Sequence, residues 1–157
     1  MRIGHGIDVH QVSTDPAREL WLGLVLIPGA PGLVGHSDAD VATHALCDAL
    51  LGAANLGDLG RNFPDSDPNL LGVSSRRLLE LTVSLLDREG LRVLSADITI
   101  IAEQPKLSNF MALMSSELTA VVGALVTVKA TTVEGLGALG RVEGLGATAV
   151  ALVEEMT

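Results

Sequence analysis

Two residue types that bind metal ions stand two positions apart near the start of the chain. Asp8 and His10 lie in the segment 1–12, which the sequence predicts to be a strand. Residues two apart in a strand point to the same face of a sheet. A carboxylate and an imidazole are therefore expected side by side, whereas His5 has the opposite parity and joins them only if Gly4 and Gly6 allow a bulge.

A third candidate ligand, His44, lies on a predicted helix. Ser37 or Asp38 is expected to be its N-cap. Its apolar face is predicted from residues at helical spacing, namely Val41, Ala45, Leu46, Ala49 and Leu50. Asp40 and Asp48 stand four residues before and after His44, so either carboxylate is a candidate to orient the imidazole, with capping or surface exposure as the alternative.

One Asp and two His residues suit a divalent transition metal, most naturally zinc. Three protein ligands at Asp8, His10 and His44 leave a fourth coordination position open. An open position is typical of a metal that holds or activates a substrate rather than of a structural metal. His36, just before this helix, is expected near a helix N-terminus, where backbone donors favour phosphate.

Composition narrows the classes of function. The 157 residues carry a net charge of −9 and 48% hydrophobic residues, which predicts one domain, residues 1–157, and argues against a general nucleic-acid surface. The lone Cys47 on the apolar helix favours a buried thiol in a reducing compartment. No apolar leader or stretch of about 18 apolar residues is present, so we expect a soluble, cytoplasmic protein without a membrane partner.

The order of the elements predicts the fold class. Strands are expected at 1–12, 20–27, 93–102, 126–132 and 145–154, and helices from residue 37 or 38, at 74–89 and at 109–122. The first two strands are expected to pair as an antiparallel ribbon, and 133–144 to be a Gly-rich loop. We therefore predict an α+β or α/β two-layer sandwich, with a mixed sheet of four to five strands and three helices on one face.

Five motifs, in this order, identify a family. They are RIGHGIDVH at 2–10, GHSDADVATHALCDALLGAANLGDLG at 35–60, NFPDSDP at 62–68, IIAEQPK at 100–106 and VKATTVEGLGALGR at 128–141. Through them the chain resembles the 2-C-methyl-D-erythritol 2,4-cyclodiphosphate synthases of the non-mevalonate isoprenoid pathway, over essentially its whole length. The resemblance implies a homotrimer with active sites at subunit interfaces, which converts a cytidine-diphosphate ester of methylerythritol 2-phosphate to a cyclic diphosphate and CMP.

The resemblance also implies a role for individual residues. Asp8, His10 and His44 match zinc ligands, Glu134 matches a residue that helps to hold magnesium or manganese on the diphosphate, and His36 and Thr132 match residues that stabilise the transition state. The positions matching the methylerythritol and 2-phosphate pocket, with the first strand, are Asp8, Val9, His10, His36, Ser37, Asp58, Leu59, Gly60, Phe63, Pro64, Asp65, Ser66 and Asp67. The positions matching the cytidine and diphosphate cradle are Ala102, Glu103, Gln104, Pro105, Lys106, Leu107, Ser108, Ala130, Thr131, Thr132, Val133, Glu134 and Arg141.

This sequence departs from the family pattern at Ala138, where many relatives carry a bulky aromatic residue in a cavity on the trimer axis, and at the Ser108 end of the nucleotide loop. Two other functions remain open from the residues alone. One is a zinc phosphohydrolase, in which a metal-bound water attacks the phosphate. The other is a non-enzymatic trimeric module with a structural zinc, which would need a fourth protein ligand.

Overall fold

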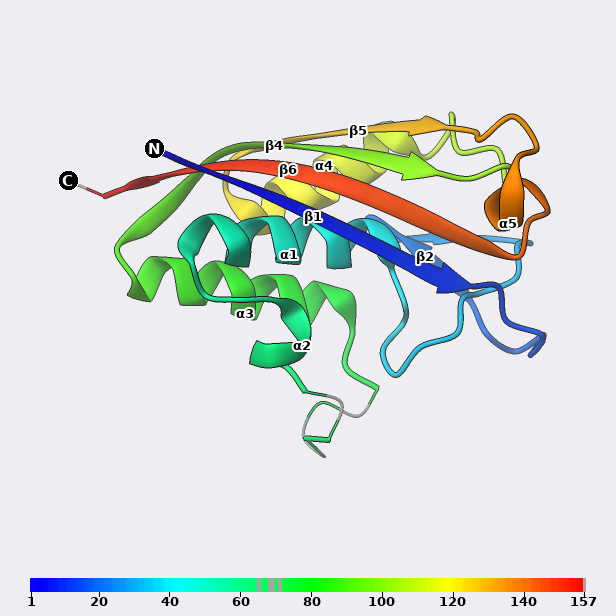
Figure 1. The fold of residues 1–157 in the computed structure, drawn as a ribbon, viewed down its shortest axis with the longest axis horizontal. Coiled ribbons are helices and arrows are strands. Elements are labelled where there is room, and N and C mark those ends of the chain that lie inside the picture. The colour runs from blue at the N-terminus through cyan, green and yellow to red at the C-terminus, as the bar shows by residue number, and fades with distance from the viewer. Residues whose placement is uncertain (65, 68–69, 71, 157) are drawn as a thin grey trace.

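The fold is built on a four-stranded mixed sheet with the strand order β1-β6-β4-β5 (Figure 1). The computed structural model describes residues 1–64, 66–67, 70 and 72–156. The strands are β1 (Arg2–Gln11), β4 (Leu91–Ile101), β5 (Leu125–Thr131) and β6 (Gly144–Glu155). β6 is antiparallel to both β1 and β4, and β4 is parallel to β5, so β1 and β5 form opposite edges of the sheet.

Helices cover one face of this sheet (Figure 1). The longer ones are α1 (Val41–Ala54), α3 (Ser75–Arg88) and α4 (Met111–Val122), and the short ones are α2 (Leu59–Asn62) and α5 (Gly137–Gly140). α1 packs under β1 and β6, α4 packs against β5, and α3 lies below α1. The predicted two-layer fold, with its mixed sheet and three helices on one face, is confirmed.

Glycines at the edge strand let α1 lie directly against the sheet. A Cβ added to Gly4 would stand 1.8 Å from the carbonyl oxygen of Ala49, and one added to Gly6 would stand 2.0 Å from that of Ala45. Small residues on both elements therefore allow backbone to pack on backbone. The bulge considered at these glycines is absent, because the β1–β6 register is unbroken from Arg2 to Gln11.

The segment 20–27 differs from its prediction. It forms two short strands, β2 (Leu20–Leu22) and β3 (Val25–Ile27), which pair with each other and not with β1. Gly23 and Leu24 between them both have positive φ, as a two-residue type I′ hairpin turn requires. The expected ribbon with the first strand is therefore wrong, because this turn folds 20–27 onto itself and β6 pairs with β1.

The start of α1 also differs from its prediction. Its N-cap is Asp40, whose carboxylate accepts a hydrogen bond from Thr43 N, so the proposed cap at Ser37 or Asp38 is wrong. The same carboxylate accepts from the backbone N–H groups of Gly23 and Leu24, each at 2.8 Å. One buried side chain thus caps α1 and anchors the β2–β3 turn, so neither Ser37 nor Asp38 is the N-cap.

The remaining predicted elements agree with the structure within about two residues. The loop 133–144 contains the short helix α5, which its glycines did not predict. Cys47 is buried in α1 as expected, and burial raises the pKa of its thiol to about 12. Among the described residues, every helix is too short or too polar to cross a bilayer.

Candidate active site

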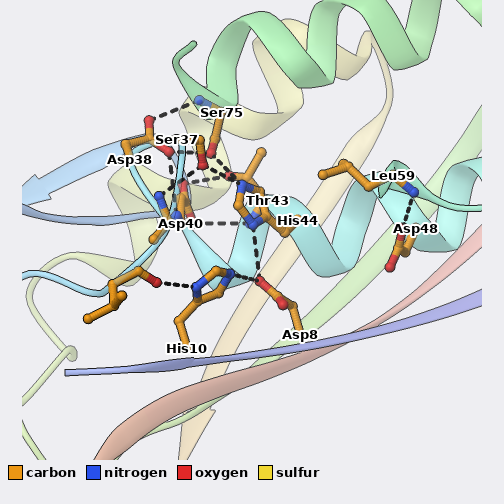
Figure 2. A network of polar contacts seen from close by, with 12 residues as sticks. Asp8, His10, Ser37, Asp38, Asp40, Thr43, His44, Asp48, Leu59 and Ser75 are labelled. Atoms are coloured by element: carbon orange, nitrogen blue, oxygen red, sulfur yellow. Dashed lines mark hydrogen bonds and ion pairs between the residues drawn. The ribbon is translucent and has the colours of Figure 1, made fainter. Parts of the chain in front are cut away.

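Asp8, His10 and His44 converge where β1 passes the start of α1. Asp8 Oδ2 lies 3.1 Å from His10 Nε2 and 3.1 Å from His44 Nδ1 (Figure 2). One donor atom from each of the three residues lies within 4.8 Å of the other two, a spacing that could hold a metal ion. Asp8 and His10 share the helix-facing side of β1, as strand parity predicts, whereas His5 points to the other side and contacts Thr148.

The ring of His10 is oriented by a backbone carbonyl. Its Nδ1 lies 2.6 Å from the carbonyl oxygen of Val34, to which it can only donate a proton. With Nδ1 protonated, the neutral imidazole keeps a lone pair at Nε2, the atom that faces Asp8. The donor set therefore fits a metal such as zinc, since the ligand lone pairs point to one place.

The charges of the triad support one another. The hydrogen bond to Asp8 raises the pKa of His10 above its usual value, despite partial burial. Burial by itself would raise the pKa of Asp8, but hydrogen bonds from His10 and His44 hold it well below its usual range. Asp8 is therefore an ionised carboxylate between two imidazoles, which is the state that a cation requires of it.

Of the two alternatives left open for Asp40 and Asp48, neither carboxylate orients His44, and Asp40 is a helix cap. The carboxylate of Asp40 accepts hydrogen bonds from the first turn of α1 and from the β2–β3 turn. Asp48 accepts a hydrogen bond from Leu59 N at 2.7 Å, which anchors α2, and partial burial raises its pKa. The partners of His44 Nε2 are instead two hydroxyl groups, Ser37 Oγ at 3.2 Å and Ser75 Oγ at 3.0 Å (Figure 2).

A cavity of about 300 Å³ opens beside the triad. It brings together eight of the predicted site residues: Asp8, His10, His36, Ser37, His44, Leu59, Gly60 and Phe63. Its other lining residues are Gly35, Asp48, Leu70, Val73 and Leu78. The lining is therefore mixed, with charged and polar side chains from the triad, His36, Ser37 and Asp48 together with apolar ones.

The loop that carries His36 and Ser37 is fixed by Arg18. The guanidinium of Arg18 donates to the carbonyl oxygens of Leu33, Gly35 (2.8 Å) and Ser37 (2.5 Å). Three backbone acceptors on alternate residues leave little freedom for the loop. His36 itself is exposed and lies four residues before Asp40, the N-cap of α1. The expected position of His36 directly at a helix N-terminus is therefore wrong.

A second cavity, of about 210 Å³, lies at the far edge of the sheet. It is lined by residues from the predicted nucleotide cradle, namely Ala102, Pro105, Lys106, Leu107, Ser108, Ala130, Thr131 and Thr132, together with Met111. Beside it, Glu103 accepts hydrogen bonds from Val133 N and Gly135 N, each at 3.0 Å, and Thr132 Oγ1 donates to Glu134 Oε1 at 2.8 Å. Glu134 lies outside the Asp8 triad.

Within one chain the two cavities stand on opposite edges of the sheet. Asp8 pairs with Ala147 on β6, Ala147 with Ile100 on β4, and Ile100 with Ala130 on β5. Three strand spacings of about 4.8 Å place Asp8 and Ala130 roughly 14 Å apart. The residues predicted for one substrate are therefore divided between two separate places.

Other predicted site residues lie outside both cavities. Val9 is on the exposed face of β1, Asp58 caps α2, and Arg141 pairs with Glu143 at 2.6 Å. The remaining ones line neither cavity: Gln104, Glu103, Val133, Glu134, Pro64, Ser66 and Asp67. Asp65 lies outside the described residues.

Sequence reasoning missed three residues that shape the site. Arg18 stands between two predicted strands, Ser75 lies in the predicted helix 74–89, and Asp38 is predicted only as an N-cap. Each acts on a partner between 15 and 37 positions away. No spacing rule connects residues so distant, so only the folded chain reveals them.

Comparisons with known proteins agree on one family. The model of the YgbB family matches residues 1–154. A 2-C-methyl-D-erythritol 2,4-cyclodiphosphate synthase from Desulfatibacillum aliphaticivorans is 50% identical, over 98% of this chain and 100% of that protein.

Solved structures give the same result. The IspF structure from Plasmodium falciparum, a CDP complex, has a TM-score of 0.85 at 29% identity, over 99% of this chain and 97% of that one. The bifunctional IspDF from Campylobacter jejuni has a TM-score of 0.88 at 36% identity. The match spans 99% of this chain but only 42% of that longer one.

Proposed function

Since the chain belongs to the YgbB family, we propose that it acts as a 2-C-methyl-D-erythritol 2,4-cyclodiphosphate synthase. It converts 4-diphosphocytidyl-2-C-methyl-D-erythritol 2-phosphate to the 2,4-cyclodiphosphate and CMP. An oxygen of the 2-phosphate forms a bond to the β-phosphorus while the bond from that phosphorus to the CMP oxygen breaks. Atoms and charge balance without water, so the enzyme is a phosphorus–oxygen lyase.

The observation that carries this proposal is the convergence of Asp8, His10 and His44 at the mouth of a cavity that also presents His36 and Ser37. These three residues would hold one divalent metal ion, zinc by the chemistry of the donors. Such an ion, when bound, supplies positive charge that polarises the β-phosphate. That charge explains how a chain with a net charge of −9 attracts so anionic a substrate.

The protein's own residues then contribute mainly by positioning. Ser37, Leu59, Gly60 and Phe63 enclose the methylerythritol 2-phosphate end beside the triad. Holding attacker and target in line removes an entropic cost that reaches about 7–11 kcal/mol in the best intramolecular reactions. His36, exposed at the cavity rim, is the donor proposed to stabilise charge that develops on the phosphoryl oxygens.

The cytidine end is proposed to bind in the second cavity, between the loop 102–108 and residues 130–132 at the end of β5. Glu134 and Thr132 adjoin it, hydrogen-bonded to each other. A carboxylate with one free oxygen beside the diphosphate suits magnesium or manganese, which prefers oxygen ligands shared with substrate phosphates. Thr132 is the second residue proposed to stabilise the transition state.

The separation of the two cavities supports a homotrimer with sites between subunits. A substrate that needs both is served best when the triad of one subunit faces the nucleotide cavity of the next. The face of the sheet opposite the helices offers such a contact surface, since Ile3, Ile7, Val9 and Val150 are 46–74% exposed there. We further propose that residues 1–157 act as one domain in the cytoplasm.

The direct test is turnover. The purified protein, with zinc and magnesium, should release CMP and yield a cyclic diphosphate whose two phosphorus resonances couple in the ³¹P spectrum. His44→Ala should abolish both products. The control is His5→Ala, which changes a histidine on the other face of β1 and should still bind metal. Release of CMP without a cyclic product would identify the phosphohydrolase, and the absence of turnover by the metal-loaded trimer would leave only the binding module.

A further inference from the structure

A chain of hydrogen bonds runs from Asp38 through Ser75 to His44 (Figure 2). Asp38 Oδ1 accepts a hydrogen bond from the hydroxyl of Ser75, and Asp38 Oδ2 accepts from its backbone N–H at 2.9 Å. The Ser75 oxygen lies 3.0 Å from His44 Nε2, on the side of the ring away from Asp8. The start of α3 is thereby connected to the ring whose Nδ1 faces the metal site.

The chemistry of the groups fixes the direction of each hydrogen bond. An ionised carboxylate only accepts, so the single hydroxyl proton of Ser75 must point to Asp38. The Ser75 oxygen can then interact with His44 only as an acceptor, which requires a proton on Nε2. His44 Nδ1 and Asp8 Oδ2 lie 3.1 Å apart. When a metal ion takes the place of the proton between them, a neutral imidazole protonated at Nε2 would offer that ion its Nδ1 lone pair.

Burial makes this arrangement persistent. Ser75 is fully buried and His44 is 8% exposed, so water does not replace either partner. Inside the protein, a lost partner leaves a buried polar group unsatisfied at a cost of about 1–3 kcal/mol. Ser37 Oγ also lies 3.2 Å from Nε2 and accepts from Ala39 N, so its own proton remains available to the cavity.

We propose that Asp38 and Ser75 are positioning residues that hold His44 in the Nε2-protonated form and thereby set the affinity of the triad for its metal. This inference depends on the metal site of the proposed function. The mirror arrangement exists at His10, where the Val34 carbonyl fixes a proton on Nδ1 and frees Nε2. Each histidine of the triad thus has its non-ligating nitrogen occupied by a fixed acceptor.

The test measures zinc affinity by chelator competition, with no substrate present. Ser75→Ala removes the acceptor, and Asp38→Asn leaves one amide oxygen for two donors of Ser75. Loss of such a partner typically costs metal affinity about 10- to 100-fold, and we expect a loss of that size in both variants. The matched control is Ser74→Ala, which removes the exposed N-cap of α3 at the neighbouring position but no contact with His44.

A second readout follows the proton itself. In the zinc-loaded protein the Nε2–H of His44 should give a slowly exchanging ¹H–¹⁵N signal, and Ser75→Ala should speed its exchange while Ser74→Ala leaves it unchanged. If Ser75→Ala fails to fold, Asp38→Asn decides. If Ser75→Ala and Asp38→Asn had the same zinc affinity and Nε2–H exchange as Ser74→Ala, this inference would be wrong, but the metal site would stand. A parent chain that binds no zinc would overturn the metal site as well.

Discussion

The chemistry of the site depends on single side chains whose neighbours fix both charge and direction. Asp8 bridges two imidazoles, and each ring presents one nitrogen to it while the other nitrogen is held by Val34 or by Ser75. Orientation is therefore established before a metal arrives. A preorganised donor set of this kind binds an ion without paying for rearrangement of its ligands.

Removal of one ligand should nearly abolish metal binding. His44→Ala takes away a donor that no other described residue of the triad replaces. We expect zinc affinity to fall by on the order of 100-fold or more, beyond the loss typical of an outer partner. Isothermal titration measures it, and His5→Ala is the control. Equal zinc affinities for both variants would refute the assignment.

Zinc binding should weaken as the solution becomes acidic. The ion needs a neutral imidazole, so protons compete with it for His10. Because Asp8 raises the pKa of His10 above 6.5, this competition begins above pH 6.5 and strengthens by about tenfold per unit below the raised pKa. Affinities measured between pH 8 and pH 5.5 check the slope. A constant affinity down to pH 6 would show that His10 is not a ligand.

At the scale of elements, the site depends on how closely α1 approaches β1. Gly6→Ala would place a methyl group 2.0 Å from the carbonyl oxygen of Ala45, so the helix must move. We expect a loss of stability of about 1–3 kcal/mol, or more, together with weaker zinc binding, because His44 moves away from Asp8. Denaturant unfolding and zinc titration measure the two effects.

The control for that variant is a glycine on α1, the helix that packs against β1. Gly52 is exposed, and a Cβ added there meets nothing within 4 Å. Gly52→Ala should therefore stabilise the protein by about 0.5–1 kcal/mol through helix propensity and leave zinc binding unchanged. If Gly6→Ala behaved like Gly52→Ala, close packing of α1 on β1 would not position the site.

The loop 33–37 is a second element on which the site depends. Arg18→Met keeps the apolar stem and removes the donors to three carbonyl groups. A displacement of about 1 Å in catalytic groups can cost on the order of 100-fold in rate, and we expect kcat to fall toward that size. Arg77→Met, which breaks the exposed pair with Glu80, should turn over normally. Equal kcat values would contradict the role of Arg18.

These elements also show what the sequence could predict. Periodicity identified the strands and helices, and parity put Asp8 and His10 on one face, because both depend only on local geometry. The cap at Asp40 and the β2–β3 hairpin were missed, because one carboxylate contacts both across the fold. The glycines of β1 suggest a possible bulge from the sequence alone. They are instead required by the close approach of α1, a contact that the local sequence does not reveal.

At the scale of the whole molecule, the two cavities lie on opposite edges of the sheet. We therefore predict that the chain is active only as an assembly of several subunits. Sedimentation should give three times the 16.2 kDa mass of one chain. Ile7→Lys charges the exposed face opposite the helices and should dissociate the trimer, with loss of CMP release but little change in zinc affinity. Leu113→Lys, on an equally apolar exposed site of α4, should remain trimeric. An active monomer would contradict this account.

The measurement that tests the central claim most directly is turnover in water enriched in ¹⁸O. Cyclisation transfers the β-phosphorus from the CMP oxygen to an oxygen already present in the 2-phosphate, so we predict no label in either CMP or the cyclic diphosphate. Mass spectrometry of both products reads the result in one experiment. One ¹⁸O atom in CMP, or in an acyclic phosphorylated product formed in place of the cyclic diphosphate, would mean that water attacks the phosphorus, and the assignment as a cyclising lyase would be wrong.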